Sequence, residues 1–183
     1  PNCSWPYAVE ARNRFTVGGG ERKMTNEELR LLPYKVGPLL YTPAIHAGIA
    51  DKLEQGAYPY ITSMAFCLED SIQDEALEQA EADLRLTLAA IKGKCLPEAN
   101  RPLLFVRVRT PEHMGRVHRM LADVSDVLTG YILPKFDLTN CDEYAKQIVL
   151  MNSGRMEPLF IMPILESKMI ADIGERNSIL QRI

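Results

Sequence analysis

The chain has 183 residues, and its 21 lysines and arginines against 24 aspartates and glutamates give a formal charge of −3. This length suits one domain with a buried core, and 46% hydrophobic with 25% charged residues is ordinary globular composition. No apolar run approaches the ~20 residues of a spanning helix, which argues against a membrane protein. The slightly acidic balance argues against a nucleic-acid partner, because phosphate binding requires an excess of basic side chains.

The cysteines do not form a zinc or redox motif. They are Cys3, Cys67, Cys95 and Cys141, and no two of them form a CxxC pair. Cys67 lies inside an apolar run and is expected to be a buried thiol. The first residues also lack the basic, apolar and small-residue regions of a secretory signal. These features favour a reduced, cytoplasmic setting.

Residues 1–36 are expected to form an irregular segment with one short helix. Thr25 and Glu28 have the spacing of a capping box, which predicts a helix that runs to about Leu32. The glycines at 18–20 are more typical of a flexible linker than of a phosphate-binding loop, because no strand-like run precedes them and no Lys-Ser or Lys-Thr pair follows.

Residues 37–183 alternate five times between strand-like and helix-like segments. The expected strands are 39–43, 60–68, 103–106, 127–133 and 159–165. The expected helices are 46–55, 71–91, 112–121, 142–151 and a last amphipathic stretch over 170–179. This order, with strands that are apolar almost throughout, predicts an α/β domain whose parallel sheet is covered on both faces.

Two parallel architectures fit this order, an open doubly wound sheet and a (β/α)₈ barrel. Strands two to five are apolar until their C-terminal ends, where charged residues follow. These are Glu69 and Asp70, Arg107 and Arg109, Lys135, and Glu166 and Lys168. In a barrel such ends meet at one mouth, where the active site lies, whereas a doubly wound sheet concentrates its ligand chemistry at one switch point. The distribution of charge therefore favours the TIM barrel.

The chain supplies about the first five β/α units of such a barrel, which normally has eight strands and about 250 residues. Five strands cannot close, and open edges leave backbone hydrogen-bonding groups unpaired. The sequence also begins with Pro1 and not with methionine. We therefore expect it to be the N-terminal part of a longer enzyme that associates as a homo-oligomer or with its missing half.

The charged strand ends have the composition of a site for Mg²⁺ and a carboxylate. Glu166, backed by Glu69 and Asp70, offers the oxygen ligands that this cation prefers. Arg107 has the planar fork that binds a carboxylate through two hydrogen bonds, and Lys135 adds a second positive charge. Such a site would orient a keto acid or thioester and stabilise an enolate, as aldol-type chemistry requires. The alternative is a rim of ordinary salt bridges.

The same strand ends resemble a known family. The runs are Leu39-Leu40-Tyr41-Thr42-Pro43-Ala44, Cys67-Leu68-Glu69-Asp70-Ser71-Ile72, Val106-Arg107-Val108, Leu133-Pro134-Lys135 and Pro163-Ile164-Leu165-Glu166-Ser167. In this order, over roughly 39–168, they resemble the HpcH/HpaI aldolase and citrate lyase beta-subunit superfamily. Cys67 stands where that family usually has Asp, and Arg109 where it often has Asn. The chain is thus similar to a divergent branch, the citrate-lyase-like proteins of tellurite-resistance and stress-response gene clusters.

The resemblance implies a TIM-barrel carbon–carbon bond lyase that binds Mg²⁺ and a carboxylate or acyl-CoA-type substrate. Arg107 matches the substrate-binding arginine, and Glu166 matches the first metal-ligating carboxylate. Thr42 and Pro43, in the first motif, are expected to contact the substrate as well. The second metal carboxylate of the family would lie beyond Ile183.

The remaining charged residues complete the expected catalytic set. Glu69 and Asp70 match the acidic pair that follows the second strand, and Lys135 matches the lysine after the fourth. With Arg107 they are the expected catalytic residues. His113 and His118 lack the spacing of an HExxH zinc site and are given no role.

The alternative function is a non-catalytic binding or scaffold protein of a stress-response system, which keeps the barrel and has lost the chemistry. Cys67 is its best support in the sequence. A barrel for phosphorylated substrates would need a phosphate-binding loop after strands seven or eight, which these residues do not include.

Overall fold

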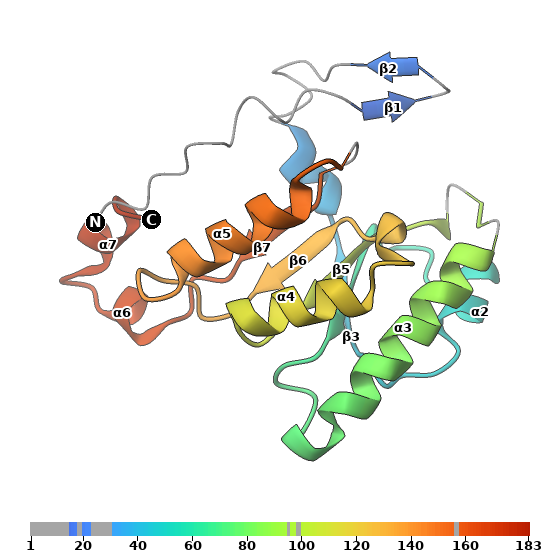
Figure 1. The fold of residues 1–183 in the computed structure, drawn as a ribbon, viewed down its shortest axis with the longest axis horizontal. Coiled ribbons are helices and arrows are strands. Elements are labelled where there is room, and N and C mark those ends of the chain that lie inside the picture. The colour runs from blue at the N-terminus through green and yellow to red at the C-terminus, as the bar shows by residue number, and fades with distance from the viewer. Residues whose placement is uncertain (1–14, 18–19, 23–30, 95, 98–99, 156–157) are drawn as a thin grey trace.

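Five short parallel strands form the sheet at the centre of the computed structural model (Figure 1), which describes residues 15–17, 20–22, 31–94, 96–97, 100–155 and 158–183. The strands are β3 (Leu39–Pro43), β4 (Ser63–Cys67), β5 (Leu103–Arg107), β6 (Gly130–Leu133) and β7 (Phe160–Pro163). Each pairs in parallel with the next strand of the sequence, in the order β3-β4-β5-β6-β7. This unreversed order is that of a barrel wall, because a doubly wound sheet reverses its order at a switch point.

Helices connect these strands and cover one face of the sheet (Figure 1). The helices between strands are α2 (Ile49–Glu54), α3 (Leu77–Gly93), α4 (Pro111–Met120) and α5 (Cys141–Asn152), and α6 (Lys168–Ala171) and α7 (Arg176–Leu180) follow β7. The 3₁₀ turns are η1 (Leu32–Val36), η2 (Asp74–Ala76) and η4 (Ser125–Val127). In α3 the buried Ala80, Leu84, Leu88 and Ile91 recur every three or four residues, so one face of the helix packs on the sheet.

Alternate residues of each strand enter two different apolar layers. The layer under the helices includes Phe66, Val106 and Tyr131. The opposite layer contains Ala65, Phe105 and Ile132, with Leu39, Leu103, Met162 and other partly buried side chains around them. A sheet that is apolar on both faces explains why its strands are apolar almost throughout, and the α/β prediction is confirmed.

Several element boundaries differ from the sequence-based expectations. The expected strand over 127–133 begins only at Gly130, because Ser125–Val127 form a 3₁₀ turn closed by the Leu128 N–H. The expected final helix is divided into α6 and α7, between which the Gly174 N–H donates to Asp172 Oδ1. This side-chain turn competes with helix continuation.

The N-terminal segment also differs from its description as irregular with one helix. Phe15–Val17 and Gly20–Arg22 form a separate antiparallel pair, β1 and β2. Strands of three residues are too short to show a hydrophobic period, which is why the sequence did not reveal them. The capping-box residues Thr25 and Glu28 lie outside the described residues. No helix in the described part of the chain combines the length and the apolar character needed to cross a membrane.

Candidate active site

The strand register aligns the C-terminal ends of the parallel strands at one end of the sheet. Cys67 of β4 lies beside Arg107 of β5, and Arg107 lies beside Ile132 of β6. Glu69 and Lys135 follow two residues after the ends of β4 and β6. Charged side chains from different β/α units therefore start from the same side of the sheet, as the chain order predicts for parallel strands.

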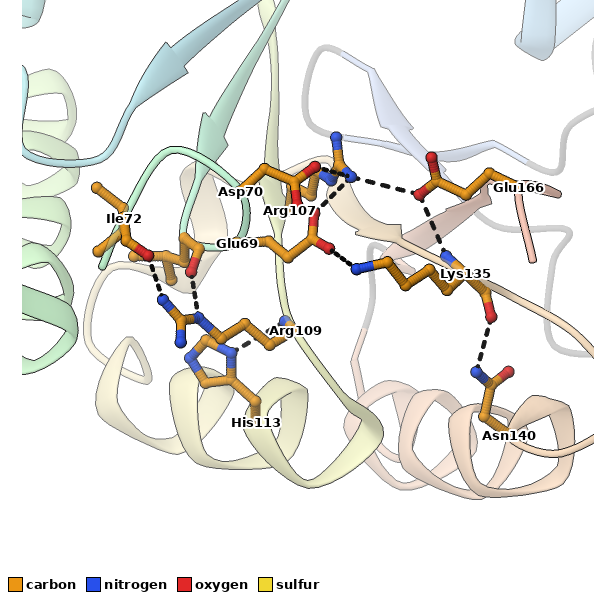
Figure 2. A network of polar contacts seen from close by, with 10 residues as sticks. Glu69, Asp70, Ile72, Arg107, Arg109, His113, Lys135, Asn140 and Glu166 are labelled. Atoms are coloured by element: carbon orange, nitrogen blue, oxygen red, sulfur yellow. Dashed lines mark hydrogen bonds and ion pairs between the residues drawn. The ribbon is translucent and has the colours of Figure 1, made fainter. Parts of the chain in front are cut away.

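Arg107 is the centre of the resulting cluster (Figure 2). Its Nη2 contacts Glu69 Oε2 and lies 2.9 Å from Asp70 Oδ2 and 3.3 Å from Glu166 Oε1. Three carboxylates from two different loops thus meet on one guanidinium nitrogen. Burial lowers the pKa of the Arg107 guanidinium, but the negative charges around it raise this pKa by more. The net effect is a raised pKa.

Lys135 closes the other side of the cluster. Its Nζ lies 2.8 Å from Glu69 Oε1, and its backbone N–H donates to Glu166 Oε1 at 3.3 Å (Figure 2). The hydrogen bond to Glu69 raises the pKa of the Lys135 ammonium, which therefore stays charged. The residue has a φ of 51°, a left-handed conformation that is strained for lysine, and the Asn140 amide donates to its carbonyl at 3.0 Å.

Burial divides these residues into an inner and an outer set. The side chains of Glu69 and Arg107 are 8% and 13% exposed, whereas those of Glu166 and Asp70 are 40% and 65% exposed. Glu69 is held between two cations, as a buried carboxylate requires. Asp70 and Glu166 lie at the rim, where a ligand can reach them.

Tyr41 belongs to this site, although the sequence analysis gave it no role. Its ring centroid lies 5.9 Å from Arg107 Cζ, within the range of a cation–π contact. Partial burial raises the pKa of its hydroxyl. The signal that could have found it is the two-residue period of β3, which places Tyr41 on the same face of the sheet as Arg107.

The structure does not bring Thr42 into the cluster. It alternates with Tyr41 along β3, is paired in register with Phe66, and is buried on the face covered by helices. Pro43 ends β3 beside Cys67 and is exposed. Cys67 itself is a buried free thiol, as its apolar neighbours predicted.

The exposed carboxylates are compatible with a magnesium ion held by few protein ligands. Within the described ranges no three His, Cys, Asp or Glu side chains are grouped to hold a metal. Mg²⁺ in enzymes is commonly bound by one or two carboxylates together with water and substrate oxygens. Glu166 and Asp70 already place oxygens around one positively charged group, Arg107 Nη2. Their donor chemistry fits a cation at the mouth.

Comparison with known families agrees with this architecture. The family of C–C bond lyases of the TIM-barrel fold matches residues 30–183 of the sequence. The chain belongs to this family. The match confirms the expected TIM-barrel fold class and the expected resemblance to carbon–carbon bond lyases of this fold. No curated protein matches the sequence significantly.

Solved structures of CitE from Mycobacterium tuberculosis are similar to the chain at 19% identity and a TM-score of 0.46. The complex with magnesium and acetate matches over 77% of this chain and 50% of that chain. For the complex with magnesium and pyruvate the shares are 80% and 52%. The citrate lyase beta subunit of the same organism, complexed with oxaloacetate and magnesium, gives 80% and 55%. The chain thus spans about half the length of these proteins.

Proposed function

We propose that the protein is a Mg²⁺-dependent carbon–carbon bond lyase that acts on a carboxylate-bearing substrate of the keto-acid or acyl-CoA type. The observation that carries this proposal is the convergence of Glu69, Asp70 and Glu166 on Arg107 at the C-terminal edge of the sheet. In TIM-barrel enzymes this edge holds the active site. Membership of a family of C–C bond lyases supports the reaction class.

Arg107 is the residue proposed to bind the substrate carboxylate. Its Nε is buried and has no hydrogen-bond partner among the described residues, and an orphaned donor of this kind costs free energy. A substrate carboxylate at the rim would replace Asp70 and Glu166 as partners of the Arg107 guanidinium. The buried Glu69 would continue to hold the guanidinium in place. Pro43, exposed at the end of β3, is proposed to contact the same substrate, whereas the buried Thr42 lies on the other face of the sheet and is not.

Glu166 is the residue proposed to hold Mg²⁺, because its carboxylate is exposed at the rim. When bound, the metal supplies positive charge that stabilises the developing enolate. Lys135 would add a second charge from the protein, since its ammonium stays protonated beside Glu69. Both charges would be in place before the chemical step. Groups that are already oriented toward the developing negative charge lower the barrier, because they need not reorganise during the reaction.

Asp70 is the carboxylate proposed to move a proton. Glu69 is buried and paired with two cations, so Asp70 is the member of the acidic pair that a substrate can reach. In cleavage, Asp70 would accept the proton of the β-hydroxyl group, and the hydroxyl carbon would become a carbonyl. The pair of electrons from the broken C–C bond would pass to the enolate, which then takes up a proton.

One observation favours a second candidate, a non-catalytic binding or scaffold protein. Arg107 Nη2 is already engaged by three carboxylates, and such a network can be purely structural. Isothermal titration of the full-length protein with pyruvate or oxaloacetate, with and without Mg²⁺, separates the two functions. We expect binding that depends on the metal. Carboxylate binding that is the same without Mg²⁺, or absent with it, would favour the scaffold.

The proposal includes a homo-oligomer in the cytoplasm. In the described sheet β3 and β7 are edge strands, whose unpaired backbone groups favour either association with another copy or pairing with further strands of a barrel. The two described cysteines, Cys67 and Cys141, are free thiols. Sedimentation equilibrium of the full-length protein tests the oligomer, and a monomer at micromolar concentration would contradict it.

A further inference from the structure

Arg109 lies two residues beyond Arg107 and makes an unusual set of contacts. Its Nε donates to the Leu68 carbonyl at 2.7 Å, and its Nη2 donates to the Ile72 carbonyl at 2.5 Å. Its Nη1 pairs with the carboxylate of Asp74. One side chain, 20% exposed, thus binds three points of the loop between β4 and α3. Figure 2 shows the contacts of its guanidinium with the backbone of this loop.

The loop that Arg109 holds is the one that carries the acidic pair. Glu69 and Asp70 lie between the two carbonyl groups that accept from the guanidinium. Within the loop, the Ile72 N–H donates to the Glu69 carbonyl at 3.1 Å, and Ser71 Oγ donates to the Cys67 carbonyl at 3.4 Å. These local bonds close a turn, and Arg109 joins both sides of it to the end of β5, where the Leu68 N–H also donates to the Arg107 carbonyl at 3.0 Å.

The backbone of Arg109 is itself fixed from the helix layer. Its N–H donates to Nδ1 of His113 at 3.0 Å, so the imidazole proton must be on Nε2. Nε2 lies 2.9 Å from Glu81 Oε1, and this buried carboxylate also accepts from Arg116 at 2.7 Å. A continuous set of hydrogen bonds therefore runs from α3 through α4 to the loop of the acidic pair.

We propose that Arg109 is a positioning residue, whose guanidinium holds the 68–74 loop so that Glu69 and Asp70 face Arg107. This inference rests on the proposed lyase function for its effect on turnover. It goes beyond that function because Arg109 touches neither Arg107 nor the proposed substrate position in the contacts described. Three acceptors in different directions suit the rigid fork of arginine and cannot all be reached by one lysine ammonium.

The test compares Arg109→Ala and Arg109→Lys with Arg85→Ala in the full-length protein. Arg85 is a matched control, because its pair with Asp123 joins α3 to the turn after α4, away from the sheet edge. Amide hydrogen exchange over 69–73 is expected to accelerate about tenfold or more in both Arg109 variants and to stay unchanged in Arg85→Ala. The lysine variant keeps the charge and most of the stem, which guards against loss of the fold.

A second measurement distinguishes positioning from a purely structural role. The ¹⁵N signals of the Arg107 guanidinium report how tightly its carboxylates restrict rotation about the Nε–Cζ bond. We expect faster rotation in both Arg109 variants, because Glu69 and Asp70 lose their fixed loop. Unchanged exchange would overturn the proposal, and so would faster exchange with unchanged Arg107 signals.

Kinetics completes the test if the wild-type enzyme turns over pyruvate-derived aldol substrates. Both variants are expected to lose about 10- to 100-fold in kcat with KM changed less than about threefold, since Arg107 remains available while Asp70 is misplaced. A loss confined to KM, or full rescue by Arg109→Lys, would overturn the positioning role. If the wild type shows no lyase activity, the proposed function fails, while exchange and the Arg107 signals still decide the role of Arg109.

Discussion

Glu69 is the residue that determines how its neighbours are arranged. A carboxylate that is 8% exposed is stable only when its charge is compensated, and here Arg107 at the end of β5 and Lys135 after β6 compensate it. Each cation is thereby fixed in the position from which it would act on a ligand. The same ion pairs thus serve stability and, in the proposed function, substrate binding.

Arg107→Ala is expected to lower the free energy of unfolding by about 3 kcal/mol or more. Removing one partner of a buried ion pair leaves an uncompensated charge, in this case Glu69. Urea unfolding measures the change. The control is Arg85→Ala, because the pair of Arg85 with Asp123 is 44% and 53% exposed and is expected to contribute less than about 1 kcal/mol. Equal losses in the two variants would contradict the buried role of Arg107.

Glu166→Gln is expected to abolish Mg²⁺-dependent turnover and leave the fold intact. The amide keeps the size of the side chain but removes the charge that a hard cation requires. Because Glu166 is 40% exposed, the free energy of unfolding should change by less than about 1 kcal/mol. Glu143→Gln, in the exposed pair with Lys146 on α5, is the matched control. Unchanged activity of Glu166→Gln would remove the metal role of this residue.

At the scale of elements, the sequence predicted the strands well and their boundaries poorly. Apolar runs that end in charge marked β4 and β7, since buried parallel strands need apolar side chains on both faces. The apolar residues before β6 led to a predicted strand that starts too early. Val127 packs against the core as part of a 3₁₀ turn and not as part of the strand. A run of apolar residues indicates which residues are buried. Where a strand begins is decided by its backbone hydrogen bonds to the neighbouring strand, which the run does not reveal.

The candidate site shows the same division between what a sequence can and cannot predict. The ends of parallel strands are brought together by topology, so Glu69, Arg107, Lys135 and Glu166 could be grouped in advance. Only the family resemblance separated Arg107 from Arg109, because one arginine ends β5 and the other follows two residues later. The direction of each side chain follows from strand alternation and from contacts with distant loops. Those contacts are absent from the local pattern.

Gly130→Ala is expected to destabilise the pairing of β6 with β7. A Cβ atom at this position would lie 2.0 Å from the backbone oxygen of Phe160, and a backbone group in a sheet cannot move aside cheaply. We expect a loss of about 1–3 kcal/mol in urea unfolding, which is typical of overpacking. Gly93→Ala, at the end of α3 with open space around it, should be neutral or stabilising. Equal stability of Gly130→Ala and the wild type would contradict the close approach of these strands.

At the scale of the whole molecule, the helix layer and the strand ends form one connected structure. Buried polar groups in the helix layer make contacts that reach the sheet edge, as His113 does through the backbone of Arg109. His118 of the same helix bonds the hydroxyl of Tyr131, a residue of β6 that is fully buried. Both histidines therefore join α4 to the sheet, and their protonation should affect the stability of the molecule as a whole.

The free energy of unfolding is expected to fall as the pH drops below about 6.5, the ordinary pKa of histidine. Burial lowers the pKa of His113 more than the hydrogen bond and the charge of Glu81 raise it, and Arg116 and Arg109 add smaller decreases. Burial also lowers the pKa of His118, with Arg155 and Arg119 acting in the same direction. Between each lowered pKa and 6.5 the unfolded chain binds more protons than the folded protein, so stability increases with pH in this window.

Urea unfolding at pH 7.5 and pH 5.5 measures this effect, because most carboxylates remain ionised over that range. The slope can reach about 1.4 kcal/mol per pH unit for each histidine. His118→Gln removes one titrating group and keeps a side chain that can accept from Tyr131, so this variant should lose stability less steeply than the wild type as the pH falls. A wild type equally stable at both pH values would show that the two imidazoles titrate alike in the folded and unfolded chains. The burial of His113 and His118 between α4 and the sheet would then not oppose the protonation of these two side chains.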